Sequence, residues 1–160
     1  MTHTKTLSLD HACEMVSQLQ RQGQCVVLAF GCFDLLHPGH TRYLAGARKL
    51  GDVLLVAVNS DQSALALKGS GRPILPASER AEIVAALEAV DCVTIFDHLR
   101  PAALISRMRP RVVVQSSGDD SPEGSTRESS GIAGVQIVRL PMSPGYSTTS
   151  IIQTAVRNLG

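Results

Sequence analysis

The chain has 160 residues, a net charge of +1 at neutral pH and 44% apolar residues. This length is typical of one domain, and the apolar fraction is sufficient for a buried core. The balanced charge argues against a nucleic-acid or anionic-membrane surface, and an aromatic content of 3% argues against a surface that stacks single-stranded bases. We therefore predict a single domain, residues 1–160, with neither nucleic acid nor membrane as a partner.

The N-terminal residues 1–5 are polar and lack the apolar core of a signal peptide. No apolar run approaches the roughly 20 residues that span a bilayer. The four cysteines are far apart and form no C-x-x-C pair, and Cys25 and Cys92 lie in apolar runs typical of core thiols. These features predict a cytoplasmic protein.

Apolar runs and helical patterns alternate along the chain. An N-terminal helix is expected within residues 1–24, capped by Ser8 or Asp10. Strands are predicted at 25–30, 53–58, 92–96, 112–114 and 135–138, and further helices at 38–50, up to 67, 78–89, 101–108 and 147–158. This alternation predicts an α/β fold: a Rossmann-like three-layer sandwich around a central, mainly parallel five-stranded sheet.

One long segment has the composition of a surface loop. Residues 116–131 contain no Ala, Val, Ile, Leu, Met or aromatic residue. A stretch of this length without apolar side chains cannot contribute to the core, so we predict a flexible loop there, either disordered or ordered on binding.

The turn after the first buried strand carries the strongest functional signal, the run G-C-F-D-L-L-H-P-G-H from Gly31 to His40. His37 and His40 are three residues apart at a helix start, so they share one face of the first turn. Free backbone N–H groups and partial positive charge are also present there, which suits a polyphosphate. Pro38 fits the first helical position, and Gly39 allows a phosphate to approach the backbone.

Two other interpretations of this turn stay open. The H-P-G-H run can simply start a helix, with both imidazoles solvated. Alternatively, Cys32, His37 and His40 can ligate a metal ion, although no fourth ligand stands at a zinc-like spacing. The preceding G-C-F-D run and the buried strand before it favour phosphate. Asp34 can either orient a histidine or hold a magnesium ion, and its spacing does not distinguish these roles.

Polar residues also follow the second strand, as Asn59 and Asp61. In parallel sheets, ligands bind beyond the carboxyl ends of the strands near the switch point, so we expect these residues to face the same crevice as the histidines. The G-x-G-x-x-G fingerprint is missing after the first strand, which argues against a redox dinucleotide.

Cations and hydroxyls suited to phosphate occur later in the chain. Lys68 and Arg72 lie in a Gly-rich loop, and Arg80 lies near the start of a helix that Ser78 is expected to cap. The run 147–149 opens the last helix, and its hydroxyl and backbone N–H groups can cap that helix, bind phosphate, or do both.

These motifs, in this order, resemble the cytidylyltransferase-like nucleotidyltransferases, a family built around G-x-F-D-x-x-H-x-G-H. The resemblance extends over about residues 7–158 and includes Gly31, Phe33, Asp34, His37, Gly39, His40, the segments 47–52 and 58–61, Lys68, Gly69, Arg72, Pro73, Arg80 and 147–149. Within the family, the sequences of segments 47–52, 59–61, 67–73 and 85–91 are similar to those of the heptose 1-phosphate adenylyltransferase branch.

The resemblance implies a reaction in which a sugar 1-phosphate oxygen attacks the α-phosphorus of ATP and pyrophosphate leaves, with Mg²⁺ bridging the phosphates. It implies that the catalytic residues are His37, His40, Lys68 and Arg80, and that Asp34 is the candidate magnesium ligand. The implied nucleotide-binding residues are Phe30, Gly31, Cys32, Phe33, Gly39, Asn59, Asp61, Arg72, Ser147, Thr148 and Thr149. Relatives of this kind are commonly dimers or larger homo-oligomers, so a homo-oligomer is expected.

Two departures from the family pattern bear on the substrates. The adenylyltransferase branch carries K-G-G-D-Y after its fourth strand, where this chain has Q-S-S-G-D at 115–119. Cytidylyltransferases carry an arginine at the position of Met142, so its absence favours ATP over CTP. The alternatives are a cytidylyltransferase acting on another phosphate, such as glycerol 3-phosphate, and a nucleotide-binding module without turnover.

Overall fold

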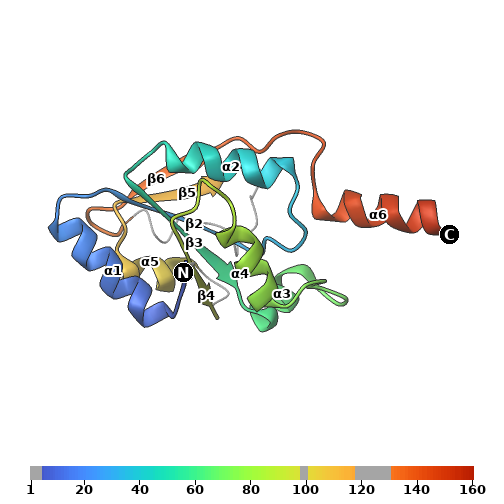
Figure 1. Ribbon diagram of the computed structural model, residues 1–160, viewed down its shortest axis with the longest axis horizontal. Coiled ribbons are helices and arrows are strands. Elements are labelled where there is room, and N and C mark those ends of the chain that lie inside the picture. The colour runs from blue at the N-terminus through green and yellow to red at the C-terminus, as the bar shows by residue number, and fades with distance from the viewer. Residues whose placement is uncertain (1–4, 98–100, 118–130) are drawn as a thin grey trace.

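The computed structural model describes residues 5–97, 101–117 and 131–160 (Figure 1). Its strands are β1 (Thr6–Leu7), β2 (Val26–Gly31), β3 (Val53–Asn59), β4 (Cys92–Phe96), β5 (Val112–Ser116) and β6 (Gln136–Leu140). Its helices are α1 (Leu9–Arg21), α2 (Pro38–Arg48), α3 (Asp61–Lys68), α4 (Ala77–Ala85), α5 (Pro101–Met108) and α6 (Thr148–Leu159). The predicted loop at 116–131 falls largely outside the described residues.

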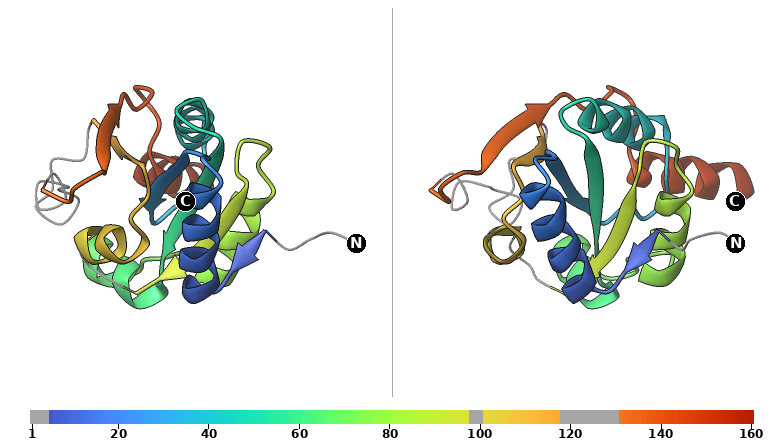
Figure 2. Two further views of the ribbon diagram at one scale, coloured as in Figure 1. Left: turned by 90° about the vertical axis from the view of Figure 1, so that its left-hand side faces the viewer. Right: turned by 60° about the vertical axis from the view of Figure 1, so that its left-hand side comes forward.

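The strands form one six-stranded sheet in the order β1-β4-β3-β2-β5-β6, and every pairing in it is parallel. Figure 2 shows the strands side by side, with β1 and β6 at opposite edges. The predicted Rossmann-like α/β class is confirmed, with six strands in place of five. The additional strand, Thr6–Leu7 beside β4, is too short to produce a sequence pattern.

Alternate residues of the central strands face two separate apolar layers, as the two-residue period of a strand requires. One layer joins the sheet to α2 and α4 through residues such as Leu44, Ala47, Ala81 and Val84. The other layer joins the sheet to α1 and α5, with buried residues that include Ala12, Val16, Leu104, Ile105 and Met108. The sheet is therefore covered on both faces, which is why its central strands β2, β3 and β4 are almost wholly apolar.

The predicted helix starts are partly confirmed. Ser8 is the N-cap of α1, where its hydroxyl accepts a hydrogen bond from His11 N, and Ser147 caps α6 in the same way. The prediction for Ser78 is wrong, because α4 begins at Ala77. The Ala77 N–H instead donates to the Asp61 carboxylate at 2.8 Å, a cap supplied from another element.

Helix α6 differs from the other helices in its burial. It contains no buried residue, and Figure 1 shows it projecting away from the sheet and its covering helices. Within the described ranges, no helix combines the length and apolar character needed to span a bilayer.

The connections of the sheet define where a ligand can enter. From β2 the chain proceeds to β3 and β4 on one side, and then crosses to β5 and β6 on the other side. The carboxyl ends of β2 and β5 therefore flank a topological switch point, the usual ligand position in open α/β sheets.

A substitution at Gly51 tests how closely the turn before β3 packs against Cys25 and Val27. An added Cβ at this position would lie 2.6 Å from the Cys25 carbonyl oxygen and 2.7 Å from Val27 Cγ2, so the backbone must shift. Gly51→Ala is expected to lower the free energy of unfolding by about 2–3 kcal/mol in urea titrations. Gly46→Ala is the control, because its Cβ would meet only the flexible end of Leu140 at 3.3 Å. An equal loss in both variants would contradict this packing argument.

Candidate active site

A cavity of about 290 Å³ opens at the switch point between β2 and β5. This volume is close to the lower end of the range for small-molecule sites. Its lining comes from the ends of these two strands, the loop into α2, the 68–73 loop and the start of α6: Phe30, Gly31, Cys32, Phe33, Asp34, His37, His40, Tyr43, Ala64, Lys68, Arg72, Pro73, Val114, Gln115, Ser116, Met142, Tyr146, Ser147, Thr148 and Thr149.

The loop from β2 into α2 is tightly folded. Phe33 has a φ of +49°, which is uncommon for a side chain other than glycine, and it is 5% exposed. A Cβ on Gly31 would lie 3.3 Å from the Phe33 ring, so the absence of a side chain at Gly31 lets this ring pack over the strand end.

The helix start of α2 carries the two histidines. His37 is the N-cap with an extended backbone (φ −141°), and its carbonyl accepts from His40 N at 2.9 Å. A Cβ on Gly39 would lie 2.9 Å from the His37 imidazole and 3.2 Å from Tyr146 Cβ. This corrects the expectation that Gly39 receives a phosphate: Gly39 does not line the cavity, and the space over it holds the His37 ring.

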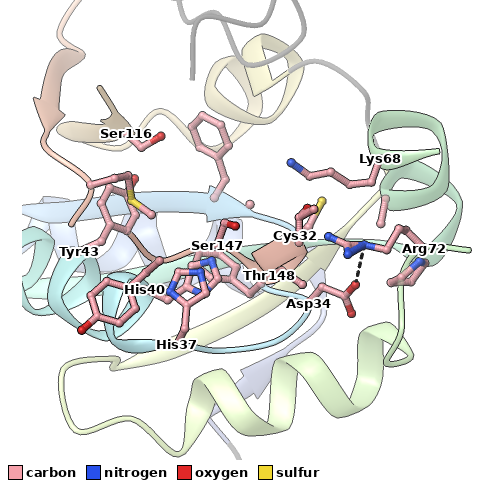
Figure 3. Close-up of a pocket in the computed structure, with 18 of the residues that line it drawn as sticks. Cys32, Asp34, His37, His40, Tyr43, Lys68, Arg72, Ser116, Ser147 and Thr148 are labelled. Carbon is pink, nitrogen blue, oxygen red and sulfur yellow. Dashed lines mark ion pairs between the residues drawn. The ribbon is translucent and has the colours of Figure 1, made fainter. Parts of the chain in front are cut away.

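The two imidazoles are stacked on each other, with ring centroids 3.9 Å apart and an angle of 21° between the planes (Figure 3). Burial, the His37 imidazole and the Lys68 ammonium together lower the pKa of His40 to about 4. Burial also lowers the pKa of His37, against an opposing backbone hydrogen bond. Both rings are therefore neutral at physiological pH in the free protein, and each offers one N–H donor.

The Nδ1 atoms of both rings are buried and have no hydrogen-bond partner within the described part of the chain. A buried polar atom without a partner costs free energy, so its retention at a cavity wall indicates a role toward a ligand.

Asp34 lines the cavity, but its carboxylate is already bound by protein groups. Its Oδ1 accepts from Ile74 N at 2.9 Å and Leu75 N at 3.1 Å, and its Oδ2 lies 3.2 Å from Arg72 Nε. Figure 3 shows this ion pair as a dashed line. A carboxylate bonded in this way fixes the 72–75 loop and does not fit the predicted role of magnesium ligand.

The alternative of a Cys32–His37–His40 metal site has no support in the geometry. Burial raises the pKa of the Cys32 thiol, although Lys68 and other cations oppose this shift. Among the described residues, no three His, Cys, Asp or Glu side chains form a group that can hold a metal ion.

Arg80 does not line the cavity, contrary to its predicted role at the departing phosphates. Its side chain is fully buried, with Nε donating to the Leu75 carbonyl, Nη1 to the Cys32 carbonyl and Nη2 to Asp61 Oδ1. Arg80 thus ties α4 to the loop after β2. The sequence shows that Arg80 is a cation, but it does not predict that its guanidinium binds these three acceptors.

Asn59 and Asp61 also lie outside the cavity lining. Asn59 Nδ2 donates to Ser63 Oγ at 3.1 Å, and Asp61 binds Arg80 and the start of α4. Asn59 Oδ1 also accepts from Cys32 Sγ at 3.8 Å, so Asn59 supports a lining residue without lining the cavity itself. The expectation that these two residues share one crevice with the histidines is wrong.

Lys68 provides a cation on the side of the cavity opposite the histidines. In Figure 3 its side chain extends from α3 toward Cys32. It has no hydrogen-bond or ion-pair partner among the described residues, whereas Arg72 is paired with Asp34. Lys68 is therefore available to a ligand anion.

The remaining wall combines β5 with the start of α6. Ser147 Oγ accepts from Ser150 N at 3.0 Å, and Thr148 Oγ1 donates to the Leu35 carbonyl at 3.2 Å. These bonds place the first turn of α6 beside the imidazoles (Figure 3). Tyr43 Oη donates to the Val114 carbonyl at 3.0 Å and so joins α2 to β5 across the crevice.

The predicted catalytic and nucleotide-binding residues leave out part of the lining, namely Tyr43, Ala64, Pro73, Val114, Gln115, Ser116, Met142 and Tyr146. Of these, the sequence links the 115–119 segment and Met142 to the choice of substrates. The switch-point rule identifies 114–116 once the strand order is known. Tyr146 has a weaker signal: it immediately precedes the serine that caps α6.

Comparison with known proteins agrees with this geometry. Residues 28–154 match the Cytidylyltransferase-like family. The chain is 45% identical over 148 residues to the Bifunctional protein HldE of Yersinia enterocolitica, and 43% identical over 144 residues to that of Nitrosococcus oceani. These alignments cover 91% and 89% of this chain but only 30% of each relative, so the chain spans about a third of their length.

A solved structure has the same fold. The lipopolysaccharide core biosynthesis protein from Thermoplasma volcanium superposes with a TM-score of 0.63 at 26% identity, covering 76% of this chain and 98% of that chain. Fold and site together define an α/β enzyme of the nucleotidyltransferase class. The chain belongs to the cytidylyltransferase-like family, as its motifs predict.

The placement of Arg80 yields a stability prediction. Arg80→Met is expected to lower the free energy of unfolding by about 2–4 kcal/mol, because two carbonyls and a carboxylate lose their donor. Arg157→Met, which removes an exposed charge from α6, is the control and is expected to change little. Urea titration checks both, and an Arg80→Met protein of wild-type stability would contradict the buried network.

The depressed pKa of His40 predicts a pH dependence. Between about pH 6.5 and pH 4 the unfolded chain binds a proton at this position that the folded chain does not, so stability falls as the pH falls. By pH 4 the loss reaches about 3 kcal/mol relative to pH 8. His40→Asn is expected to remove this part of the dependence in urea titrations across pH, whereas His11→Asn, an exposed position on α1, retains it.

Proposed function

We propose that this chain transfers AMP from ATP to a sugar 1-phosphate, specifically a heptose 1-phosphate, and releases ADP-heptose and pyrophosphate. The observation that carries the proposal is the stacked His37–His40 pair at the start of α2, in one cavity with Lys68 and the first turn of α6. The motif resemblance to heptose 1-phosphate adenylyltransferases supports the choice of sugar. So do the relatives named HldE and the structural neighbour named for lipopolysaccharide core biosynthesis.

The chemistry is a single displacement at phosphorus. An oxygen of the sugar phosphate forms a bond to the α-phosphorus of ATP, and the bond from that phosphorus to the bridging oxygen breaks. The electron pair leaves with pyrophosphate. Such a step needs alignment of the reactants and donors where negative charge accumulates, and no covalent intermediate with the protein.

The cavity residues divide these tasks. The imidazole N–H groups of His37 and His40 donate to oxygens of the triphosphate and stabilise the pentavalent arrangement. Lys68 balances the charge on the departing pyrophosphate. The N–H groups and hydroxyls of Ser147–Thr149 add donors from the start of a helix, where the dipole also favours an anion.

Magnesium is proposed to enter as part of the substrate, held by the phosphates of ATP. The Asp34 carboxylate is bound to backbone N–H groups and Arg72, so it does not serve as a ligand. Instead, it fixes the loop that follows Lys68 in the chain.

The acceptor is proposed to bind near β5 and Met142. Gln115, Ser116 and Met142 line this wall, in place of the lysine found after the fourth strand in the adenylyltransferase branch. The acceptor would therefore meet neutral hydrogen-bonding groups here. The resemblance further supports a homo-oligomer.

The decisive experiment incubates the purified protein with Mg²⁺, ATP or CTP, and a panel of acceptors that contains heptose, hexose and glycerol phosphates. Released pyrophosphate gives the rate, and mass spectrometry identifies the product. ADP-heptose from ATP is the expected result. CDP-glycerol from CTP would establish the alternative transferase, and nucleotide binding without any product would establish a binding module.

Removing one imidazole tests the catalytic assignment. His40→Ala is expected to lower kcat by on the order of 10²-fold, by analogy with the loss of one oxyanion donor. His11→Ala, on the exposed side of α1, is the matched control and is expected to retain the wild-type rate. A His40→Ala protein with wild-type kcat would remove the histidine pair from the mechanism.

A further inference from the structure

Five side chains pack one against the next beside the cavity, in the order Arg42, Tyr146, His37, His40 and Phe33, and all of them except Arg42 line it. The rings of Tyr146 and His37 are stacked with centroids 6.1 Å apart at 19°, those of His37 and His40 are stacked 3.9 Å apart, and the Phe33 ring packs against His40 at 5.4 Å with a tilt of 58°. Arg42 Cζ lies 5.4 Å from the Tyr146 centroid. We call this arrangement the ring column.

The ring column supplies the orientation that hydrogen bonds do not. The Nδ1 atoms of His37 and His40 have no partner among the described residues, so no bond at Nδ1 fixes either ring. In most catalytic or ligand-binding histidines, a second hydrogen bond sets the ring orientation. Here the rings are held by the side chains stacked on them.

The inner end of the column is rigid. Phe33 is buried, adopts a positive φ and packs on Gly31, so its ring cannot move without disturbing the end of β2. The His40 ring lies against it and is therefore fixed from one side.

The outer end depends on Tyr146. Its Cβ lies close above Gly39, and the next residue is the N-cap of α6, so both helix starts define its position. Tyr146 remains 39% exposed, and the exposed Arg42 of α2 packs on its ring. Without Tyr146, the His37 ring would have no ring stacked on its outer side.

We propose that Tyr146, supported by Arg42, is a positioning residue that holds His37, and through it His40, in the orientation used toward the triphosphate. This inference rests on the proposed function, and it adds a residue outside the H-P-G-H motif to the machinery. The start of α6 lies beside the histidines, and Tyr146, the residue before its N-cap, provides the outermost ring of the ring column.

Kinetics separate a positioning role from direct contact with a substrate. Tyr146→Leu keeps apolar bulk but removes the ring, and is expected to lower kcat by about 3- to 10-fold, the range of one aromatic pair, with KM for ATP unchanged. Tyr146→Phe keeps the ring and is expected to restore kcat. A raised KM with unchanged kcat in Tyr146→Leu, or a Tyr146→Phe protein as slow as Tyr146→Leu, would overturn the proposal.

The Arg42 contact has its own matched pair of variants. Arg42→Gln is expected to lower kcat by about 2- to 5-fold, which corresponds to one exposed cation–π contact. Arg157→Gln removes the same charge from the exposed surface of α6 and is expected to have no effect. Equal changes in both variants would assign the effect to net charge and overturn the role of Arg42.

A spectroscopic signature tests the stack without turnover. In the free protein, ring currents from Tyr146 are expected to shift the NMR signal of the His37 Cε1–H group. Tyr146→Leu should move this signal, while Tyr146→Phe should leave it close to its wild-type position. An unmoved His37 signal in Tyr146→Leu would refute the ring column, whether or not the protein turns over ATP. Absence of turnover in the wild type would refute only the proposed function.

Discussion

The rest of the structure depends on the order of the strands around β2. The chain adds β3 and β4 on one side of β2 and then β5 and β6 on the other side. Because the connections from β2 and β5 lead in opposite directions, a cavity opens between the carboxyl ends of these two strands. The loop into α2 must cross one side of this opening, and the start of α6 closes the other. The loop into α2 supplies the imidazoles, the end of α3 supplies Lys68, and the start of α6 supplies hydroxyl and backbone N–H groups.

The charged residues near this opening have two distinct roles. Lys68 remains without a partner among the described side chains and faces the cavity, whereas Arg80 and Arg72 are bound to carboxylates that fix loops. Asp34 and Asp61 follow neighbouring strands: Asp34 accepts the backbone N–H groups of Ile74 and Leu75, which lie between α3 and α4, and Asp61 accepts that of Ala77, the first residue of α4. The segment from α3 to the start of α4 is therefore anchored at two points, which holds in place the loop that begins beside Lys68.

The histidine pair illustrates how packing and chemistry are linked. Burial lowers the pKa of both stacked imidazoles, and the charge of His37 and of Lys68 lowers the pKa of His40 further, so both rings are neutral at physiological pH in the free protein. The same crowding requires Gly39, because a side chain there would occupy the place of the His37 ring. Gly39 therefore leaves space for the His37 imidazole. In the proposed function, a phosphate would contact the two imidazoles and not the backbone at Gly39.

The sequence by itself determined the α/β class, the helix start at Pro38 and the family, because local patterns encode strands, helix starts and the spacing of His37 and His40. The tertiary structure alone decided that Arg80, Asn59 and Asp61 lie outside the cavity, since their partners are carbonyls, backbone N–H groups and side chains brought together by folding. It likewise revealed Tyr146, whose contact with His37 joins segments more than a hundred residues apart. A residue type specifies what a side chain can bind, but only the fold determines which of its possible partners it meets.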